Sequence, residues 1–173
     1  MKYLIVSDIH GSYESSNIIV DKFNKHNCDK ILILGDILYH GPRNDLPENY
    51  NPKKVITTLN PISDKIIAVR GNCDAEVDQM VLDFKIHDEY RLVDNNKTYV
   101  LTHGHHLDEL DLNNVDVVVY GHTHIIKRFY KDNVSFINLG SITIPKENTA
   151  RCYAILENSN ISIYDINDKL IKD

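Results

Sequence analysis

Two histidines, His122 and His124, stand directly after the apolar run Val117–Tyr120 and a glycine, Gly121. Residues two apart in an extended chain point to the same side, so both imidazoles can enter one pocket at the end of a buried strand. The glycine lets the backbone turn tightly before them. Because His-x-His pairs also occur on plain surfaces, this pair gains its weight from other places in the chain.

At four further places, residues of metal-binding type follow predicted strands: Asp8 and His10 after 2–7, Asp36 after 30–34, Asn72 after 65–69, and His103 after 98–101. Taken singly, Asp and Asn after a strand are most typical of turns and caps. Taken together, with four histidines at equivalent positions, they favour a metal site.

These seven groups comprise two carboxylates, one amide oxygen and four imidazoles, which are too many for one tetrahedral zinc ion. They suit two adjacent five- or six-coordinate ions that share a bridging carboxylate. The mixed oxygen and nitrogen set fits manganese, iron, cobalt, nickel or zinc, and fits Mg²⁺ alone less well. Two such ions, about 3.5–4 Å apart, can clamp an in-line displacement at phosphorus, with a bridging hydroxide as the nucleophile.

The first half of the chain alternates predicted strands, over 2–7, 30–34 and 65–69, with predicted helices. Ser12 is the expected N-cap of a helix to about residue 26, and Pro52 starts a helix over 52–59. A short helix is expected from residue 75. This alternation predicts a parallel sheet covered by helices, with ligands bound outside the carboxyl ends of its strands.

The second half changes character. Residues 89–93 and 98–101 predict a hairpin, and 107–112 a short helix. A strand over 115–120 is followed by antiparallel strands within 125–131, 134–138 and 151–164. We therefore expect an α/β (α+β) fold, with two mixed sheets packed face to face and flanked by helices. Without repeats or a linker, residues 1–173 are expected to form a single domain.

The composition, 42% hydrophobic and 25% charged with a net charge of −6, is that of an ordinary globular protein. The sequence has no Lys/Arg-rich run, so we expect no stable complex with nucleic acid. No stretch is apolar enough for a membrane span. The short apolar run at the N-terminus and three widely spaced cysteines, Cys28, Cys73 and Cys152, predict a cytoplasmic protein. The oligomeric state is open, and a homo-oligomer is one alternative.

Five segments resemble, in order, the five motifs of the calcineurin-like metallophosphoesterase superfamily. They are Asp8-x-His10, Gly35-Asp36, Gly71-Asn72-Cys73-Asp74, Thr102-His103-Gly104-His105 and Gly121-His122-Thr123-His124. The resemblance runs from Met1 to about Pro145. In Gly41-Pro42-Arg43-Asn44 and in Arg70–Asp74, the chain resembles most the small YfcE-like bacterial phosphodiesterases.

The resemblance implies a four-layer α-β-β-α sandwich with a dinuclear site, most often supplied with Mn²⁺; Zn²⁺, Fe²⁺, Ni²⁺ and Co²⁺ are the alternatives. By position, one ion takes Asp8, His10 and His124. The other takes Asn72, His103 and His122, and Asp36 bridges the two ions.

The resemblance also suggests catalytic residues: Cys73, Asp74 and His105. Many family members carry histidine where this chain has Cys73, as a candidate acid for the leaving group; a thiol donates a proton less readily than imidazolium at neutral pH. The alternative for Cys73 is a buried thiol with a structural role only. His105 is a substrate contact, a support for a ligand, or a surface residue. Arg43 and Asn44 either bind the substrate phosphate or belong to a solvated loop.

The expected function is that of a metal-dependent phosphodiesterase acting on a small phosphodiester. A phosphomonoesterase at the same site is one alternative. The other is a non-catalytic scaffold with this fold, as in the retromer subunit that resembles the family. A scaffold would be free to lose ligands, whereas this sequence retains all seven.

Overall fold

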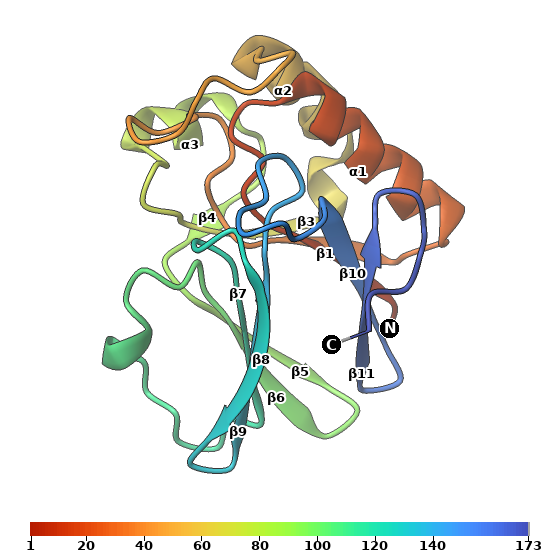
Figure 1. Ribbon diagram of the computed structural model, residues 1–173, viewed down its shortest axis with the longest axis vertical. Coiled ribbons are helices and arrows are strands. Elements are labelled where there is room, and N and C mark those ends of the chain that lie inside the picture. Colours follow the sequence, from red (N-terminus) through yellow and green to blue (C-terminus); the bar gives the residue numbers. More distant parts are fainter. Residues whose placement is uncertain (173) are drawn as a thin grey trace.

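Two mixed β-sheets pack face to face in the computed structural model, which describes residues 1–172, and the main helices lie together against one of them (Figure 1). The first sheet has the strand order β11-β10-β1-β2-β3-β4, and the second has the order β5-β6-β7-β9-β8. The expected fold class, two mixed sheets flanked by helices, is confirmed.

The helices are α1 (Tyr13–Lys25), α2 (Pro52–Leu59) and α3 (Glu76–Val81), with 3₁₀ segments η1 (Asn60–Lys65) and η2 (Leu107–Glu109). The strands of the first sheet are β1 (Tyr3–Val6), β2 (Lys30–Ile33), β3 (Ile66–Val69), β4 (Ile86–His87), β10 (Cys152–Glu157) and β11 (Asn160–Asp165). Those of the second are β5 (Tyr90–Asp94), β6 (Lys97–Leu101), β7 (Val117–Tyr120), β8 (Ile126–Lys131) and β9 (Val134–Leu139).

The first sheet is buried on both faces, which explains the unbroken apolar runs of its central strands. On β1, Leu4 and Val6 belong to the core beneath the helices, whereas Tyr3 and Ile5 belong to the core between the sheets. Strands β1 to β4 are parallel, and β10 is antiparallel to β1. Helix α1 begins where expected, because the side chain of Ser12 accepts a hydrogen bond from the backbone N–H of Ser15.

The outer face of the second sheet has a thin cover. Instead of the expected helix over 107–112, the chain forms only the 3₁₀ turn η2. Leu107, Leu110 and Leu112 pack from this segment onto a small core that includes Val118 and Phe136 of the sheet. Three apolar side chains are therefore enough to cover this face, and the fourth layer is reduced to a turn and its loop.

Two features of the topology were not expected from the sequence. Strand β4 has only two residues, too few for a periodic pattern to show. The hairpin of β10 and β11 follows the strands of the second sheet in the sequence, but it belongs to the first sheet. There β10 pairs with β1, and Ile5 lies opposite Ala154. This crossover brings the segment that follows β9 to the carboxyl end of β1.

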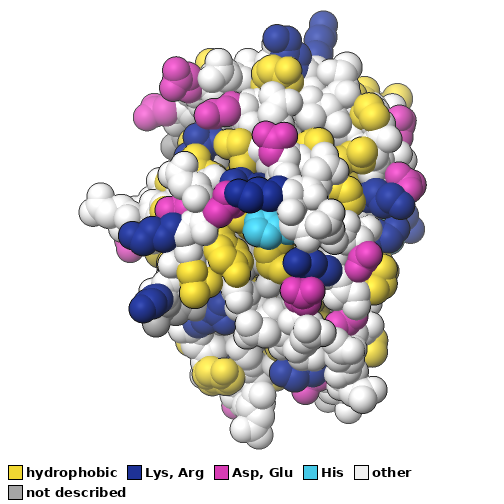
Figure 2. All heavy atoms as spheres, turned by 90° about the vertical axis from the view of Figure 1, so that its right-hand side faces the viewer, with side chains coloured by type: hydrophobic (Ala, Val, Ile, Leu, Met, Phe, Trp, Pro, Cys, Tyr) yellow, Lys and Arg dark blue, Asp and Glu magenta, His cyan; other side chains and the backbone are white. Residues whose placement is uncertain are grey.

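Helix α1 is tied to the C-terminal hairpin through Asp168, in the turn after β11. Its carboxylate accepts hydrogen bonds from Lys22 (2.7 Å), Lys25 (2.6 Å) and the hydroxyl of Tyr153 (2.5 Å). The lysines hold the pKa of Asp168 well below its usual range. On this side of the molecule, basic and acidic side chains are interspersed and no continuous basic patch forms (Figure 2).

Within residues 1–172, no helix combines the length and the apolar composition that crossing a bilayer requires.

We predict that Asp168→Asn lowers the melting temperature at pH 7 by about 2–4 °C, because the neutral amide weakens its contacts with both lysines. Asn tolerates the positive φ of 69° at this position, so the change is electrostatic. Since folding depresses the pKa of Asp168, its contribution is present above the unfolded value of about 4 and is lost as the pH falls further.

Thermal unfolding at pH 7 and pH 3 measures this effect, and the gap between the two proteins should narrow at pH 3. Asp132→Asn is the matched control, since Asp132 is exposed and also has a positive φ. Equal melting temperatures at pH 7 would show that the lysine contacts do not stabilise the fold.

Candidate metal centre

All seven predicted ligands lie at one end of the sandwich, each in a loop that follows the carboxyl end of a strand. Asp8, His10 and His103 are fully buried, and Asp36 and His124 are 2% exposed. His122 is half-buried and Asn72 is exposed at the mouth of the site. The strands involved are β1, β2 and β3 of the first sheet and β6 and β7 of the second. The site therefore lies where the two sheets meet.

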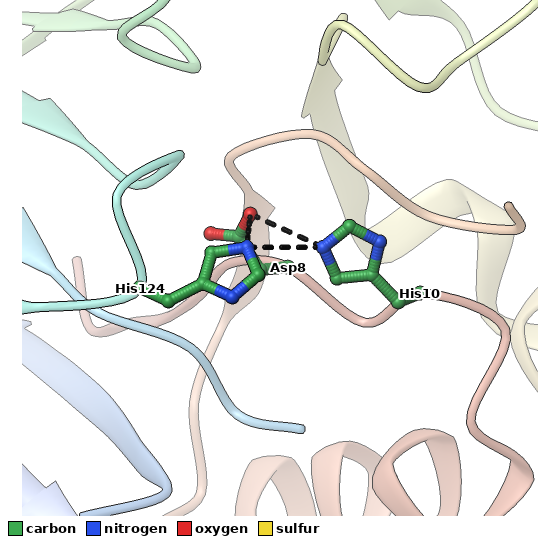
Figure 3. Close-up of side chains that lie close together, drawn as sticks. All are labelled: Asp8, His10 and His124. Atoms are coloured by element: carbon green, nitrogen blue, oxygen red, sulfur yellow. Dashed lines mark hydrogen bonds and ion pairs between the residues drawn. The ribbon is translucent and has the colours of Figure 1, made fainter. Parts of the chain in front are cut away.

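One group of ligand atoms consists of Asp8, His10 and His124, which point toward one another (Figure 3). Nε2 of His124 lies 3.1 Å from Oδ1 of Asp8 and 3.2 Å from Nε2 of His10. Nε2 of His10 lies 3.6 Å from the same carboxylate oxygen. Three donor atoms from distant parts of the chain thus surround one small space.

Asp36 joins this group to a second one. Its Oδ2 lies 3.6 Å from Nε2 of His10 and 3.4 Å from Nε2 of His103. Nε2 of His103 is 3.1 Å from Oδ1 of Asn72, and the ring of His122 is 5.1 Å from that of His103. The carboxylate of Asp36 therefore stands between two sets of ligand atoms.

Three of the imidazoles are oriented by backbone carbonyl oxygens that accept from Nδ1: Tyr39 for His10 (2.9 Å), Leu34 for His103 (2.7 Å) and Ile144 for His124 (2.8 Å). A carbonyl can only accept, so Nδ1 carries a proton in either charge state, and in the neutral imidazole Nε2 presents its lone pair to the centre. This is the tautomer that a metal ligand needs, fixed by contacts outside the ligand set.

One carboxylate oxygen has no hydrogen-bond partner. Oδ2 of Asp8 accepts from the hydroxyl of Ser7 (2.6 Å) and the backbone N–H of His122 (3.1 Å). Oδ1, which faces the imidazoles, is buried and unpartnered among the described residues. A buried carboxylate oxygen that faces imidazole Nε2 atoms needs a compensating positive charge, and the residues present fit a divalent metal in that role.

The carboxylates dominate the electrostatics of this centre. Burial by itself would raise the pKa of Asp8 and lower that of His103. The attraction between carboxylates and neighbouring imidazoles prevails over burial in both cases. Contacts with His10 and His124 hold the pKa of Asp8 far below its usual range. The contact with Asp36 raises the pKa of His103 to about 9. The contact with His103 lowers the pKa of Asp36 despite its burial. Asp8 and Asp36 are therefore both anionic at neutral pH, as metal binding needs.

The backbone at five of the seven positions is left-handed, with φ of 58° at Asp8, 49° at His10, 55° at Asp36, 67° at His122 and 62° at His124. His10, His122 and His124 are the only histidines with positive φ among residues 1–172. Positive φ is unfavourable for non-glycine residues and persists only where the surroundings enforce it. The turns thus aim the side chains at the centre at some expense in stability.

The glycines beside the ligands have a steric role. A Cβ on Gly121 would overlap the hydroxyl of Ser7 and the carboxylate of Asp8. A Cβ on Gly71 would overlap the backbone N–H and the carboxylate of Asp36. Loops from different strands therefore approach so closely that only glycine fits, which accounts for the Gly-Asn and Gly-His pairs of the sequence.

Asp74, predicted to be catalytic, has surroundings that favour a different role. Its carboxylate accepts hydrogen bonds from the backbone N–H groups of Asp36 (2.8 Å), Ile37 (2.7 Å) and Gly71 (2.7 Å). It therefore connects the loop after β2 to the loop after β3. These contacts are those of a residue that positions Asp36.

Cys73 lies close to the centre. Its Sγ is within 4.8 Å of ligand atoms of His10 and Asp36, and its backbone N–H donates to Oδ1 of Asp36 (2.8 Å). Burial and the charge of Asp36 raise the pKa of the thiol to about 12. Cys73 is therefore a neutral thiol at the edge of the site. The three cysteines are all unpaired.

The mouth of the site is a cleft lined by Asp36, Asn72 and His122 together with Arg43, Asn44 and Cys73. Asn44 donates from Nδ2 to the carbonyl oxygen of His40 (2.8 Å), which shapes the loop that carries Arg43. His105 lies on another side of the centre, with its ring 5.5 Å from that of His103.

Sequence reasoning missed one residue of this cleft, Lys146. It belongs to the loop after β9, which surrounds His124. Ile144 accepts from Nδ1 of His124, the backbone N–H of Lys146 donates to the carbonyl oxygen of His124 (3.0 Å), and the hydroxyl of Thr149 donates to the same oxygen (3.2 Å). No periodic pattern or motif marks Lys146, so only the folded loop reveals it.

The chain is similar to several known proteins. Residues 1–160 match the family model of the calcineurin-like phosphoesterase superfamily domain. The chain is 42% identical to phosphodiesterase YfcE of Escherichia coli (strain K12), over 99% of this chain and 95% of that protein. A solved structure of YfcE, a phosphoesterase from E. coli, matches with a TM-score of 0.91 and 39% identity, covering 99% and 97% of the two chains.

The structure of Vacuolar Protein Sorting 29 from Cryptosporidium parvum also matches, with a TM-score of 0.66 and 16% identity over 99% of this chain and 92% of that one. At this identity the likeness concerns the fold alone.

The two sheets and the helices are those of a metallophosphoesterase: the chain belongs to the calcineurin-like phosphoesterase superfamily. Within the superfamily it is a homologue of the phosphodiesterase YfcE. The resemblance drawn from five short motifs is therefore confirmed over nearly the whole chain.

We predict that Asp74→Asn lowers the free energy of unfolding by about 1–3 kcal/mol, because its amide leaves a buried backbone N–H without an acceptor. The loss should be seen in urea unfolding with a chelator present, and metal retention should fall as Asp36 is displaced. Asp83→Asn, an exposed change in the following segment, is the control. Unchanged unfolding together with lost turnover would instead support the catalytic role first expected for Asp74.

Proposed function

We propose that this protein is a metal-dependent phosphodiesterase with a dinuclear site. The observation that carries the proposal is the arrangement of the Nε2 atoms of His10, His103 and His124 around the oxygens of Asp8 and Asp36. A backbone carbonyl outside the site holds each of these three imidazoles. Asp8, His10 and His124 would hold one ion, and Asn72, His103 and His122 the other. Asp36 lies between the two sets and would bridge them.

A pair of divalent ions bound by these residues would supply a hydroxide nucleophile at neutral pH and neutralise the charge that builds on the phosphoryl oxygens. The mixed donor set supports manganese first, with zinc, iron, nickel and cobalt as alternatives.

The chain's own residues do the remaining work. Arg43 and Lys146 line the cleft as cations and would bind the phosphate oxygens of the substrate. Cys73 stands at the same cleft with a protonated thiol, where it would give a proton to the departing alcohol oxygen. Asp74 would hold Asp36 in place through the backbone. Since Arg43 and Cys73 come from loops after different strands, the intact sandwich is needed to bring them together.

The proposed substrate is a small phosphodiester in the cytoplasm, without a stable nucleic-acid complex. The net charge of −6 supports the second part, because a phosphate backbone is bound by continuous basic surfaces. On the one face shown in Figure 2, basic and acidic side chains are interspersed. The alternative function is that of a non-catalytic scaffold. The likeness to Vacuolar Protein Sorting 29 supports the shared fold and gives no support to a scaffold function.

The test is hydrolysis of bis(p-nitrophenyl) phosphate by protein of assayed metal content, with Mn²⁺ and with a chelator. The proposal expects turnover that depends on the metal, and a lower rate on p-nitrophenyl phosphate. A higher rate on the monoester would favour a phosphomonoesterase. No turnover by folded, metal-loaded protein would favour the scaffold.

We predict that Asp36→Asn lowers kcat/KM for the diester by at least about 100-fold, since one bridging charge would serve both ions. The fold should remain, because the amide still offers an oxygen to the backbone N–H of Cys73. Metal analysis and thermal unfolding accompany the assay, with Asp45→Asn in the exposed loop as control. Normal turnover of Asp36→Asn would contradict the bridging assignment.

We predict that Cys73→His retains activity and extends it toward esters with poorer leaving groups. A histidine donates a proton more readily at neutral pH than a thiol whose pKa is raised to about 12. Rates on aryl diesters of increasing phenol pKa measure this change, and Cys73→Ser serves as the control. Complete loss of activity with metals still bound would show that the position does not lie at the leaving group.

A further inference from the structure

A hollow of about 390 Å³ lies beside the metal centre, and its walls include Arg70, Glu89, His105, Glu109 and Leu110. We propose that it binds the ester group that stays on phosphorus when the other alcohol departs. We further propose that it selects uncharged alcohols over alcohols that carry a second phosphate. This inference rests on the proposed function and names the substrate class for it.

The hollow and the metal centre share a wall. The ring of His105 lies 5.5 Å from that of His103 and 6.1 Å from that of His122, both predicted ligands. Arg70 directly precedes Gly71 and Asn72 in the chain. The loops that carry the ligands therefore also form the side of the hollow, and a group attached to the reacting phosphorus can extend into it.

Size separates the hollow from the cleft of Arg43 and Cys73. The cleft offers about 40 Å³ of free space, roughly a tenth of the 390 Å³ in the hollow. The hollow is within the range of sites that hold small organic ligands, whereas the cleft accommodates little beyond a phosphate group. A nucleoside- or sugar-sized group that remains on phosphorus fits only the hollow.

Charge separates the two spaces as well. The carboxylates of Asp88, Glu89 and Glu109 line the hollow. Glu89 is paired with Arg91 (3.2 Å) and Glu109 with His106 (3.0 Å). The single guanidinium in the lining is that of Arg70. That guanidinium already donates to Asp88 (3.3 Å). The cleft instead carries Arg43 and Lys146, neither of which forms an ion pair within residues 1–172. The reacting phosphate is attracted to the cleft, whereas a further phosphate in the hollow meets carboxylates and no unpaired Lys or Arg among the lining residues.

The experiment compares three p-nitrophenyl phosphodiesters that share one leaving group, on Mn²⁺-loaded protein. Their second alcohols are methanol, the 5′-hydroxyl of thymidine, and the 5′-hydroxyl of thymidine 3′-phosphate. We expect the thymidine ester to exceed its 3′-phosphorylated counterpart by about tenfold in kcat/KM.

Glu109→Lys reverses one charge at the rim, where Glu109 is exposed. It should reduce the preference several-fold, through KM. Asp21→Lys makes the same charge change on the exposed surface of α1 and should leave the preference unchanged. A preference that is the same in the wild type and both variants would overturn the charge assignment.

Leu110→Trp fills the hollow. It should raise KM for the thymidine ester about tenfold and leave the methyl ester within about twofold. The methyl ester thus reports whether the variant is folded and active. Equal effects on both esters would overturn the assignment of the hollow as an ester-group site.

A binding measurement separates this inference from the proposed function. Thymidine alone, titrated into ¹⁵N-labelled protein, should shift the amide signals of Glu89 and of residues 105–110. Shifts confined to residues 41–44 would overturn the inference whether or not the protein turns over diesters. Shifts at the hollow without any diester hydrolysis would contradict the proposed function and leave the binding site standing.

Discussion

Two buried carboxylates impose the main constraint on this structure. Asp8 and Asp36 are almost completely buried where two apolar sheets meet, and buried charges are tolerated only when neighbouring groups compensate them. The compensation comes from several directions: imidazoles at the ends of three strands, backbone N–H groups of His122 and Cys73, and the hydroxyl of Ser7. The loops at this end of the sandwich are arranged around these two negative charges.

The loops meet this constraint through unfavourable local geometry. Left-handed φ values at Asp8, His10 and Asp36 turn the chain sharply after β1 and β2, so that consecutive polar side chains face inward rather than toward solvent. Gly71 and Gly121 allow the loops to approach without a side chain between them. Stability supplied by the apolar strands is in this way used to hold an anionic centre, as is common at functional sites.

Much of this arrangement follows from local patterns in the sequence. The unbroken apolar runs identify β1, β2, β3 and β7, because these strands are buried on both faces. Ser12 and Pro52 fix the starts of α1 and α2 through their own backbone chemistry. The ligand set follows from one topological rule, since polar residues at the carboxyl ends of neighbouring strands lie together.

Features set by long-range packing could not be predicted. The two residues of β4 are too few to show a pattern. The position of β10 beside β1 depends on the register of the whole sheet, and so does the approach of Lys146 to the cleft. The roles of Asp74 and His105 were also out of reach, because a sequence motif shows neither which backbone groups a carboxylate meets nor the hollow beside an imidazole.

The loop around His124 connects the candidate metal centre to the C-terminal hairpin of β10 and β11. It connects β9 to β10, and β10 pairs with β1, which leads into Asp8. An ion bound by Asp8 and His124 would therefore contact both the strand that pairs with β10 and the loop that leads into β10. Ion binding and docking of the C-terminal hairpin would then be thermodynamically linked. Such linkage is reciprocal: the free energy by which the ion would stabilise the docked hairpin equals the free energy by which the docked hairpin would tighten ion binding.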